Sequence, residues 1–405
     1  MPAKQTGSTA TRAAILTIDR MTCRRSPHLV CYWRGADFFI ENYATTVRVT
    51  AQPIASDILG FFDDWRPVKA LLALRPPETR DALRSLIGQL VDHSLLQRAG
   101  ESLSQPERAM SQWSAWNPAA GFFHTTTRDL RFMDLETQLR QLRKRSRVRP
   151  MPDAVKRIRG ARLIELPCTD LTSEFPGVLL TRRTWRRFSR RTVDLAAFGT
   201  LLSLTAGIQR WAHAEGEGEV ALKTSPSGGA RHSIELYTLA LRVDGLPRGL
   251  YHFAADVHAL ELIDSKVSSR LLPRYLPNQP WYKPAAALVF FAASFPRELW
   301  RYPYARAYRA VLIEAGHLCQ TFCLTATWLG LAPFCTLALA DSRIEKDIQL
   351  DGITESVLYA AGIGARPLAA DARPPQTRAG ESAVLNRGEV EKFPGRIVRH
   401  IRNKR

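Results

Sequence analysis

The sequence predicts a two-domain protein in which both domains combine strands with helices. Residues 28–50 carry short strand patterns with period-two alternation, and three short helical patterns follow them. Residues 285–293 are almost wholly apolar, which is typical of a strand buried on both faces. Residues 306–329 then keep apolar side chains at helical spacing and end at Gly330, a suitable C-cap residue. A chain of 405 residues is long enough for two such domains.

The first domain is expected to be winged-helix-like and to cover residues 26–100, after a disordered N-terminus at 1–25. Its third helix would expose a mixed face that includes Arg80, Asp81 and Asp92. DNA docking needs clustered Lys and Arg, so we favour docking of a peptide or partner protein over nucleic acid. The expected strands are 29–33, 38–40 and 46–50, with another opening at Leu95, and the expected helices are 53–62, 68–74 and 79–92.

A linker is expected at 101–165, first irregular and aromatic, then strongly basic from 140 to 162. The aromatic side chains would wrap onto a core or a neighbouring subunit. The basic side chains would form either a solvated face or a dock for acidic residues of a partner. The second domain would then occupy 166–368, and residues 369–405 would be a mobile or partner-wrapping tail.

Bulk composition narrows the class of protein. The net charge of +19 favours anionic partners such as a phosphorylated cofactor or an acidic peptide. The six cysteines include no C-x-x-C pair, so buried thiols are expected and no metal site is predicted. The sequence contains neither an apolar run that could span a membrane nor the apolar core of a signal peptide, which favours a cytoplasmic protein.

Two segments of the second domain could bind a ligand. Arg182, Arg183, Thr184 and Arg186 could converge on one phosphate if their segment were a turn that enters a helix. Taken alone, they are better interpreted as surface residues of an arginine-rich protein. The turn Pro226–Gly229 fixes one backbone angle with proline and frees two positions with glycine, so main-chain N–H groups could approach a flat ligand.

In this order the segments resemble the nitroreductase-like flavoprotein family, and within it the SagB-type branch of azoline oxidases and peptide-maturation dehydrogenases. The resemblance covers about residues 175–365. It rests on Arg182-Arg183-Thr184-x-Arg186, on Pro226-Ser227-Gly228-Gly229-Ala230-Arg231-His232, on Gly245-Leu246-x-x-Gly249-Leu250-Tyr251-His252, and on Arg306-Ala307-Tyr308-Arg309 running into Glu314-Ala315-Gly316-His317-x-x-Gln320.

The resemblance implies an α+β homodimer that holds FMN at the subunit interface. The four residues of the arginine segment would face the phosphate, and Arg366 is a further candidate for it. Pro226, Ser227, Gly228 and Gly229 would lie along the isoalloxazine ring. The helix with Glu314, His317 and Gln320 would lie at or near the dimer contact. A precursor peptide and a cyclodehydratase-type enzyme are the implied partners.

In the azoline oxidases a Lys-Tyr pair shortly before the Arg-x-Tyr-Arg run is linked to substrate deprotonation, and this sequence has Arg301-Tyr302 nearby. A guanidinium stays protonated at ordinary pH and cannot act as a base. Tyr302 is therefore the expected base, with Arg301 stabilising its phenolate, and Tyr304 and Tyr308 are competing candidates.

Three functions follow as hypotheses. The favoured one is an FMN-dependent dehydrogenase that matures a ribosomally synthesised peptide by oxidising azoline rings to azoles. The alternatives are an NAD(P)H-dependent nitroreductase or flavin reductase, and a non-enzymatic winged-helix regulator with a flavin-like sensor domain.

Overall fold

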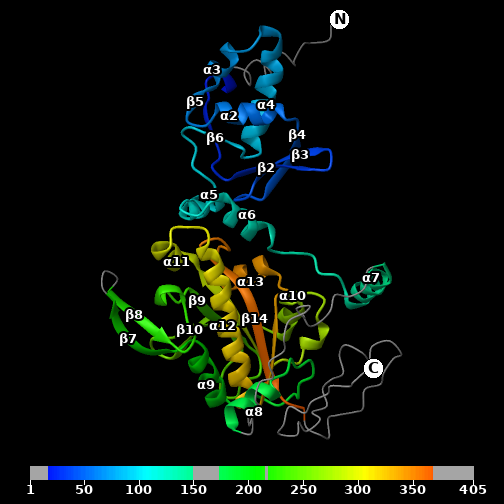
Figure 1. Cartoon of the computed structure of the whole chain (residues 1–405), viewed down its shortest axis with the longest axis vertical. Coiled ribbons are helices and arrows are strands. Elements are labelled where there is room, and N and C mark those ends of the chain that lie inside the picture. Colours follow the sequence, from blue (N-terminus) through cyan, green and yellow to red (C-terminus); the bar gives the residue numbers. More distant parts are fainter. Residues whose placement is uncertain (1–16, 149–172, 215–217, 368–405) are drawn as a thin grey trace, which may run out of the picture. The chain divides into compact units, whose positions relative to one another are not determined.

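The computed structural model describes residues 17–148, 173–214 and 218–367 (Figure 1). The chain divides into two compact units. Unit 1 comprises Met1–Arg128, Ser294–Val311 and Gln349–Ser356, and unit 2 comprises the remaining residues. The first unit therefore includes two segments that the sequence assigns to the second domain. The predicted tail at 369–405, Cys168 and the basic residues after 148 lie outside the described residues.

Unit 1 begins with two small antiparallel sheets and three helices. The sheet orders are β5-β1-β6 and β2-β3-β4. The predicted strands and helices occur within a few residues of their expected positions, while the winged-helix interpretation stays a prediction. The elements are β1 (Thr22–Arg25), β2 (Leu29–Arg34), β3 (Asp37–Asn42), β4 (Val47–Ala51), α2 (Ile54–Phe61), β5 (Arg66–Pro67), α3 (Val68–Ala73), α4 (Arg80–Asp92) and β6 (Leu96–Arg98).

The N-terminal boundary needs a correction. Residues 22–25, which the sequence places in a disordered N-terminus, form β1, the middle strand of its sheet. Cys23 on this strand is fully buried in the apolar core with Ile40, Phe62 and Ile87. The four-residue strand is too short for periodicity to reveal it, and tertiary burial determines its conformation.

The segment predicted to be irregular also differs, because residues 101–126 are largely helical. They form α5 (Gln105–Met110), a short 3-10 turn and α6 (Pro118–Thr126). The start signals are local: the Ser104 side chain accepts from the Glu107 N–H, and the Asn117 side chain accepts from the Ala119 N–H. A capping serine followed by Glu three residues later, and Asn before Pro, are recognised helix starts.

The aromatic side chains of this region pack as expected for a segment that covers a core. Trp113 and Trp116 are each 3% exposed, and their rings lie 4.9 Å apart. Trp113 also contacts Phe295 at 4.6 Å between ring centroids, and its indole N–H donates to the Ile353 carbonyl. These contacts join α6 and its neighbours to α11 (Phe295–Arg301) and to the loop 349–354. These contacts explain why residues 294–311 and 349–356 belong to unit 1.

His124 lies at the centre of this aromatic cluster and is 1% exposed. Its Nδ1 lies 2.9 Å from the Tyr308 hydroxyl and its Nε2 lies 2.9 Å from the Gly352 carbonyl oxygen. Since a carbonyl can only accept, Nε2 carries the proton and Nδ1 accepts from Tyr308. Burial lowers the pKa of His124 from 6.5 to about 4, so the ring is neutral in the folded protein at neutral pH.

Unit 1 is therefore expected to lose stability in mild acid. Below pH 6.5 the unfolded chain protonates His124 while the folded chain does not, so stability falls from pH 6.5 down to about pH 4. Between pH 7 and pH 5 this residue alone should remove about 2 kcal/mol from the free energy of unfolding. Urea unfolding at the two pH values measures the loss. A His124→Gln variant should show a smaller loss, and an equal loss in both proteins would contradict the assignment.

Unit 2 contains a six-stranded sheet in the order β11-β10-β9-β12-β14-β13. The neighbouring pairs β11–β10, β10–β9, β9–β12 and β14–β13 are antiparallel. The predicted apolar strand β12 is buried on both faces, as expected. The strands are β9 (Ile234–Ala240), β10 (Gly249–Ala254), β11 (Ala259–Asp264), β12 (Ala287–Ser294), β13 (Leu331–Thr336) and β14 (Glu355–Ala365), with the separate hairpin β7 (Ile208–Ala214) and β8 (Gly218–Lys223).

The helices of unit 2 include the predicted long helix α12 (Ala307–Trp328), whose first residues belong to unit 1. Phe322 of α12 contacts Phe291 of β12, which packs the helix against the sheet. Gly330 follows with φ +73°, a left-handed conformation that favours glycine at a helix end. The others are α7 (Leu135–Val148), α8 (Glu174–Thr181), α9 (Leu195–Ala206), α10 (Leu272–Tyr275) and α13 (Asp341–Asp347). Among the described residues, no helix combines the length and apolar character needed to cross a membrane.

Candidate active site

The predicted glycine turn is attached to α12 through a buried carboxylate. The Ser227 hydroxyl donates to Glu314 Oε2 at 2.6 Å, and the Ile234 N–H donates to Glu314 Oε1 at 3.2 Å. Ser227 Oγ also accepts from the His232 N–H at 2.8 Å. Glu314 is 2% exposed, and burial raises the pKa of its carboxyl group above the usual value. This one side chain therefore holds both ends of the loop 227–234.

The backbone of this loop is shaped for close approach. Gly229 has φ +55°, and Ala230 and His232 also have positive φ. The N–H groups of Ala230 and Arg231 donate back to the carbonyls of Ser227 and Gly228. The N–H groups of Gly228 and Gly229 have no acceptor among the residues that the structure describes. Two adjacent donors without side chains can reach acceptor atoms of a flat ligand.

Two further contacts attach the preceding residues to the same face of α12. His317 Nδ1 lies 3.4 Å from the Pro226 carbonyl oxygen, and the Ser225 and Thr321 hydroxyls are 2.9 Å apart. Glu314, His317 and Thr321 follow one another at spacings of three and four residues, so they form one stripe along the helix. His317 thus has a hydrogen-bonding role in positioning the loop.

The arginine segment has a different geometry from the expected one. It follows the C-terminus of α8, where Arg182 is the C-cap residue, and it does not enter a helix. The chain instead runs along the sheet edge: the Trp185 N–H donates to the Pro333 carbonyl, and the Ser189 N–H donates to the Ala365 carbonyl. The C-terminus of α8 carries a partial negative charge, so a phosphate there would depend on the guanidinium groups and not on a helix dipole.

The predicted phosphate ligands fall into two groups. Arg183 donates to the carbonyls of Leu180 and Arg182, and Arg366 donates to those of Leu331 and Thr327, so both stabilise the local backbone. Arg366 also lies over the Trp185 ring at 5.6 Å. Thr184 and Arg186 are exposed and Arg182 is half-buried. These last three side chains make no hydrogen bond or ion pair within the described part of the chain, so they can turn to an anion.

Helix α12 relates the loop to the arginine segment. The loop is attached at Glu314, His317 and Thr321, and Arg366 is attached at Thr327. His317 and Thr327 are ten positions apart, which corresponds to about 15 Å along the helix. The loop and Arg366 are thus held at separate levels of α12, and the arginine segment is linked to Arg366 through the contact of Trp185 with its guanidinium. Both segments belong to unit 2.

The predicted catalytic pair belongs to unit 1. Arg301 Nε donates to the Tyr302 hydroxyl oxygen at 3.0 Å, and its guanidinium lies 5.4 Å from the Tyr302 ring centroid. Tyr302 is half-buried and its carbonyl accepts from the Trp116 indole N–H. Tyr304 is 52% exposed, whereas Tyr308 is buried and bonded to His124. Tyr302 thus has a cationic donor on its hydroxyl oxygen.

Sequence reasoning missed the role of Glu314, which it assigned only to the neighbourhood of a dimer contact. A carboxylate among apolar residues at helical spacing was the available signal, since buried acids are rare without partners. It also missed that Cys319, Cys323 and Cys335 come together, because no local motif links a helix to the strand after it.

The family comparison agrees with this architecture. Residues 179–365 match the model of the Nitroreductase family, so this part of the chain is similar to that family. The resemblance to that family which the motifs indicate is thereby confirmed.

The chain is similar to two proteins with processing functions in their names and to one named as a putative nitroreductase. It is 32% identical over 152 residues to the trifolitoxin-processing protein TfxB of Rhizobium leguminosarum bv. trifolii, covering 35% of this chain and 39% of that protein. It is 31% identical over 146 residues to the microcin B17-processing protein McbC of Escherichia coli, covering 34% of this chain and 53% of that protein. It is 28% identical over 174 residues to the putative nitroreductase MJ1384 of Methanocaldococcus jannaschii, covering 43% of this chain and 83% of that protein. The aligned region thus spans about two fifths of TfxB and about half of McbC.

Proposed function

We propose that this chain is an FMN-dependent dehydrogenase that matures a ribosomally synthesised peptide by oxidising azoline rings to azoles. The observation that carries the proposal is that α12 holds both the glycine loop, through Glu314, and Arg366, whose guanidinium lies over Trp185 of the arginine segment. The similarity to the trifolitoxin- and microcin B17-processing proteins supports a peptide as substrate. A homodimer and a cyclodehydratase-type partner enzyme belong to the same proposal.

The donor set of unit 2 fits FMN. Members of the family typically bind flavin. The free N–H groups of Gly228 and Gly229 suit the carbonyl and nitrogen edge of an isoalloxazine ring. Arg182, Thr184 and Arg186 supply two guanidinium groups and a hydroxyl for a phosphate dianion. The guanidinium N–H groups of Arg183 and Arg366 that bind backbone carbonyls would stabilise this segment and would not bind the phosphate.

Azoline oxidation removes a hydride from one ring carbon and a proton from its neighbour. Bound FMN supplies the two-electron acceptor for the hydride. The protein's own task is to orient the substrate ring and to accept the proton. Tyr302 can accept it as phenolate, because the Arg301 guanidinium at 3.0 Å stabilises negative charge on that oxygen.

The phosphate assignment predicts a difference between two flavins. Replacing Arg182 and Arg186 together with Gln should weaken FMN binding by at least about tenfold, because two charge-assisted hydrogen bonds are lost. Riboflavin lacks the phosphate, so its affinity should stay unchanged. Fluorescence titration of both flavins measures this, and Arg270→Gln at an exposed position of unit 2 is the control. Equal losses for FMN and riboflavin would exclude a phosphate contact.

The base assignment predicts a loss of turnover without a loss of cofactor. Tyr302→Phe should lower the rate of peptide oxidation by about 100-fold or more, since general bases contribute about that much. Flavin content should equal that of the unaltered protein, and Tyr304→Phe serves as the matched control. Turnover of an azoline-containing peptide is followed by mass spectrometry. Undiminished turnover in the Tyr302 variant would remove this residue from the mechanism.

The runner-up function is an NAD(P)H-dependent nitroreductase, which the similarity to MJ1384 over 83% of that protein favours. Stopped-flow spectroscopy separates the two functions. Rapid reduction of the bound flavin by NAD(P)H would support the runner-up, whereas slow reduction by NAD(P)H and fast reduction by an azoline peptide would support the dehydrogenase.

Unit 1 offers a binding surface for the peptide or a partner enzyme. A cavity of about 660 Å³ opens between β1, β2 and α2. Arg24 and Arg25 contribute positive charge to its lining, and Leu29 and Leu59 contribute apolar surface. A segment that carries an acidic and an apolar side chain would match this lining. The full lining is Arg24, Arg25, Ser26, Pro27, Leu29, Cys31, Ser56, Leu59, Gly60 and Asp63.

A further inference from the structure

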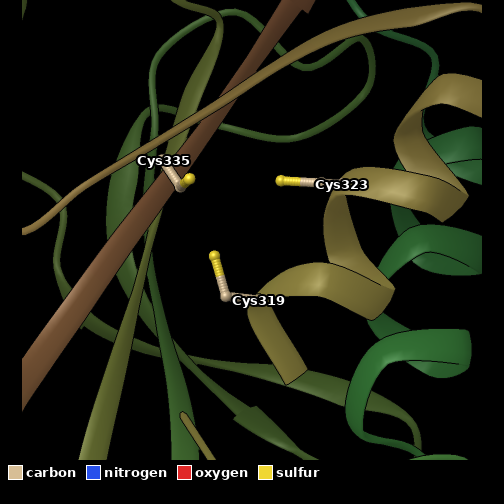
Figure 2. Close-up of side chains that lie close together, drawn as sticks. All are labelled: Cys319, Cys323 and Cys335. Carbon is tan, nitrogen blue, oxygen red and sulfur yellow. The ribbon is translucent and has the colours of Figure 1, made fainter. Parts of the chain in front are cut away.

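Three cysteine thiols converge in unit 2, away from the loop contacts of α12. Cys319 and Cys323 lie one turn apart on α12, and Cys335 lies on β13 (Figure 2). Figure 2 shows their sulfur atoms pointing toward one shared space, and all three lie within 4.8 Å of one another. Cys319 and Cys323 are 2% and 4% exposed, while Cys335 is partly exposed.

We propose that Cys319, Cys323 and Cys335 form a binding site for a thiophilic divalent cation of the Zn²⁺ type. Thiolates are soft ligands that select such ions, whereas Mg²⁺ and Ca²⁺ require oxygen ligands. A zinc–sulfur bond of about 2.3 Å places sulfur atoms about 3.8 Å apart around a tetrahedral ion. The cluster therefore needs to contract by about 1 Å or less to bind the ion.

The surroundings supply a fourth ligand, a countercharge and access. The Tyr359 hydroxyl lies 3.3 Å from Cys335 Sγ, so its oxygen or a water can complete four-coordination. Three thiolates around a divalent ion leave one negative charge, and the positive charge of Arg182 acts favourably on Cys323 and Cys335. The partial exposure of Cys335 gives the ion a route into the site.

The competing interpretation is three buried thiols that pack as small apolar side chains. Such thiols need not converge. Two cysteines one turn apart on a helix can be buried without a third cysteine from the following strand beside them. The contribution from two elements and the common direction of the thiols distinguish this cluster from an apolar stripe. Ion binding would also join α12 to β13 across the turn at Gly330.

The test is metal uptake by the full-length, tag-free protein, purified without metal in a phosphine reductant. We expect one equivalent of Zn²⁺ per chain by equilibrium dialysis, and a thiolate-to-metal absorption band when Cd²⁺ replaces it. Cys335→Ser should weaken binding by more than about 100-fold, because it removes a direct ligand. Cys31→Ser, at an exposed position of unit 1, should leave binding unchanged.

Folding is checked separately, by circular dichroism of each variant. Cys335→Ser is the primary variant because Cys335 is the least buried of the three, and Cys319→Ser is the second. Zn²⁺ should raise the melting temperature of the unaltered protein and not that of a folded Cys335 variant. Absence of a Cd²⁺ absorption band in the unaltered protein, or equal uptake by a folded Cys335→Ser variant, would overturn the proposal. Neither readout depends on flavin.

Discussion

Replacing Glu314 with alanine is expected to destabilise the protein by about 2–4 kcal/mol and to weaken FMN binding by more than tenfold. The substitution removes the acceptor of the Ser227 hydroxyl and of the Ile234 N–H, both near the buried carboxylate. Each buried donor left without a partner costs about 1–3 kcal/mol. The loop then loses its attachment to α12, so the Gly228 and Gly229 N–H groups no longer hold a fixed position.

Two measurements check this expectation: urea unfolding and fluorescence titration with FMN. Glu314→Gln should be milder on both counts, because the amide oxygen still accepts one hydrogen bond. Glu219→Ala, at a 63% exposed side chain, should change stability by less than about 0.5 kcal/mol. If Glu314→Ala unfolds as the unaltered protein does and retains FMN, the carboxylate does not hold the loop.

Replacing Trp113 with alanine is expected to cost about 3–5 kcal/mol, the usual range for a buried Trp in a core. Trp113 is 3% exposed and contacts the rings of Trp116, His124, Phe295 and Tyr308. The substitution also removes the hydrogen bond from the Trp113 indole N–H to the Ile353 carbonyl. Since these contacts bind residues 294–311 and 349–356 to the N-terminal helices, those two segments should loosen together.

Hydrogen–deuterium exchange measures this loosening. Exchange in the Trp113→Ala variant should rise in 294–311 and 349–356 and stay unchanged in the β7–β8 hairpin of unit 2. The matched control is Trp211→Ala on β7, where the side chain is 55% exposed. Faster exchange confined to residues 105–126 would show that the aromatic cluster does not stabilise the later segments.

Much of the fold could be predicted from local sequence. The strand β12 and the helix α12 were visible because long, strongly patterned segments carry their own signal. Asp194 caps α9, where its side chain accepts from the Ala197 N–H at 2.9 Å, and Asp before a helical pattern is a common local start signal. Strand β1 and helix α5 are short, and β1 depends on pairing with residues more than forty positions away.

The candidate site was predictable in its residues but not in its geometry. The sequence indicates that Arg182 and Gly228 belong to a cofactor site, yet it cannot show that Arg183 and Arg366 bind backbone carbonyls. It also cannot show that Arg182 ends a helix instead of preceding one. The contacts of Arg366 join residues more than thirty positions apart, and no local pattern encodes them.

The visible absorption spectrum of the full-length protein, mixed with excess FMN and then desalted, tests the central claim most directly. Flavin bands should remain at about one FMN per chain, and the variant with both Arg182 and Arg186 replaced by Gln should lose them. A colourless protein after desalting, with its fold intact by circular dichroism, would contradict the account.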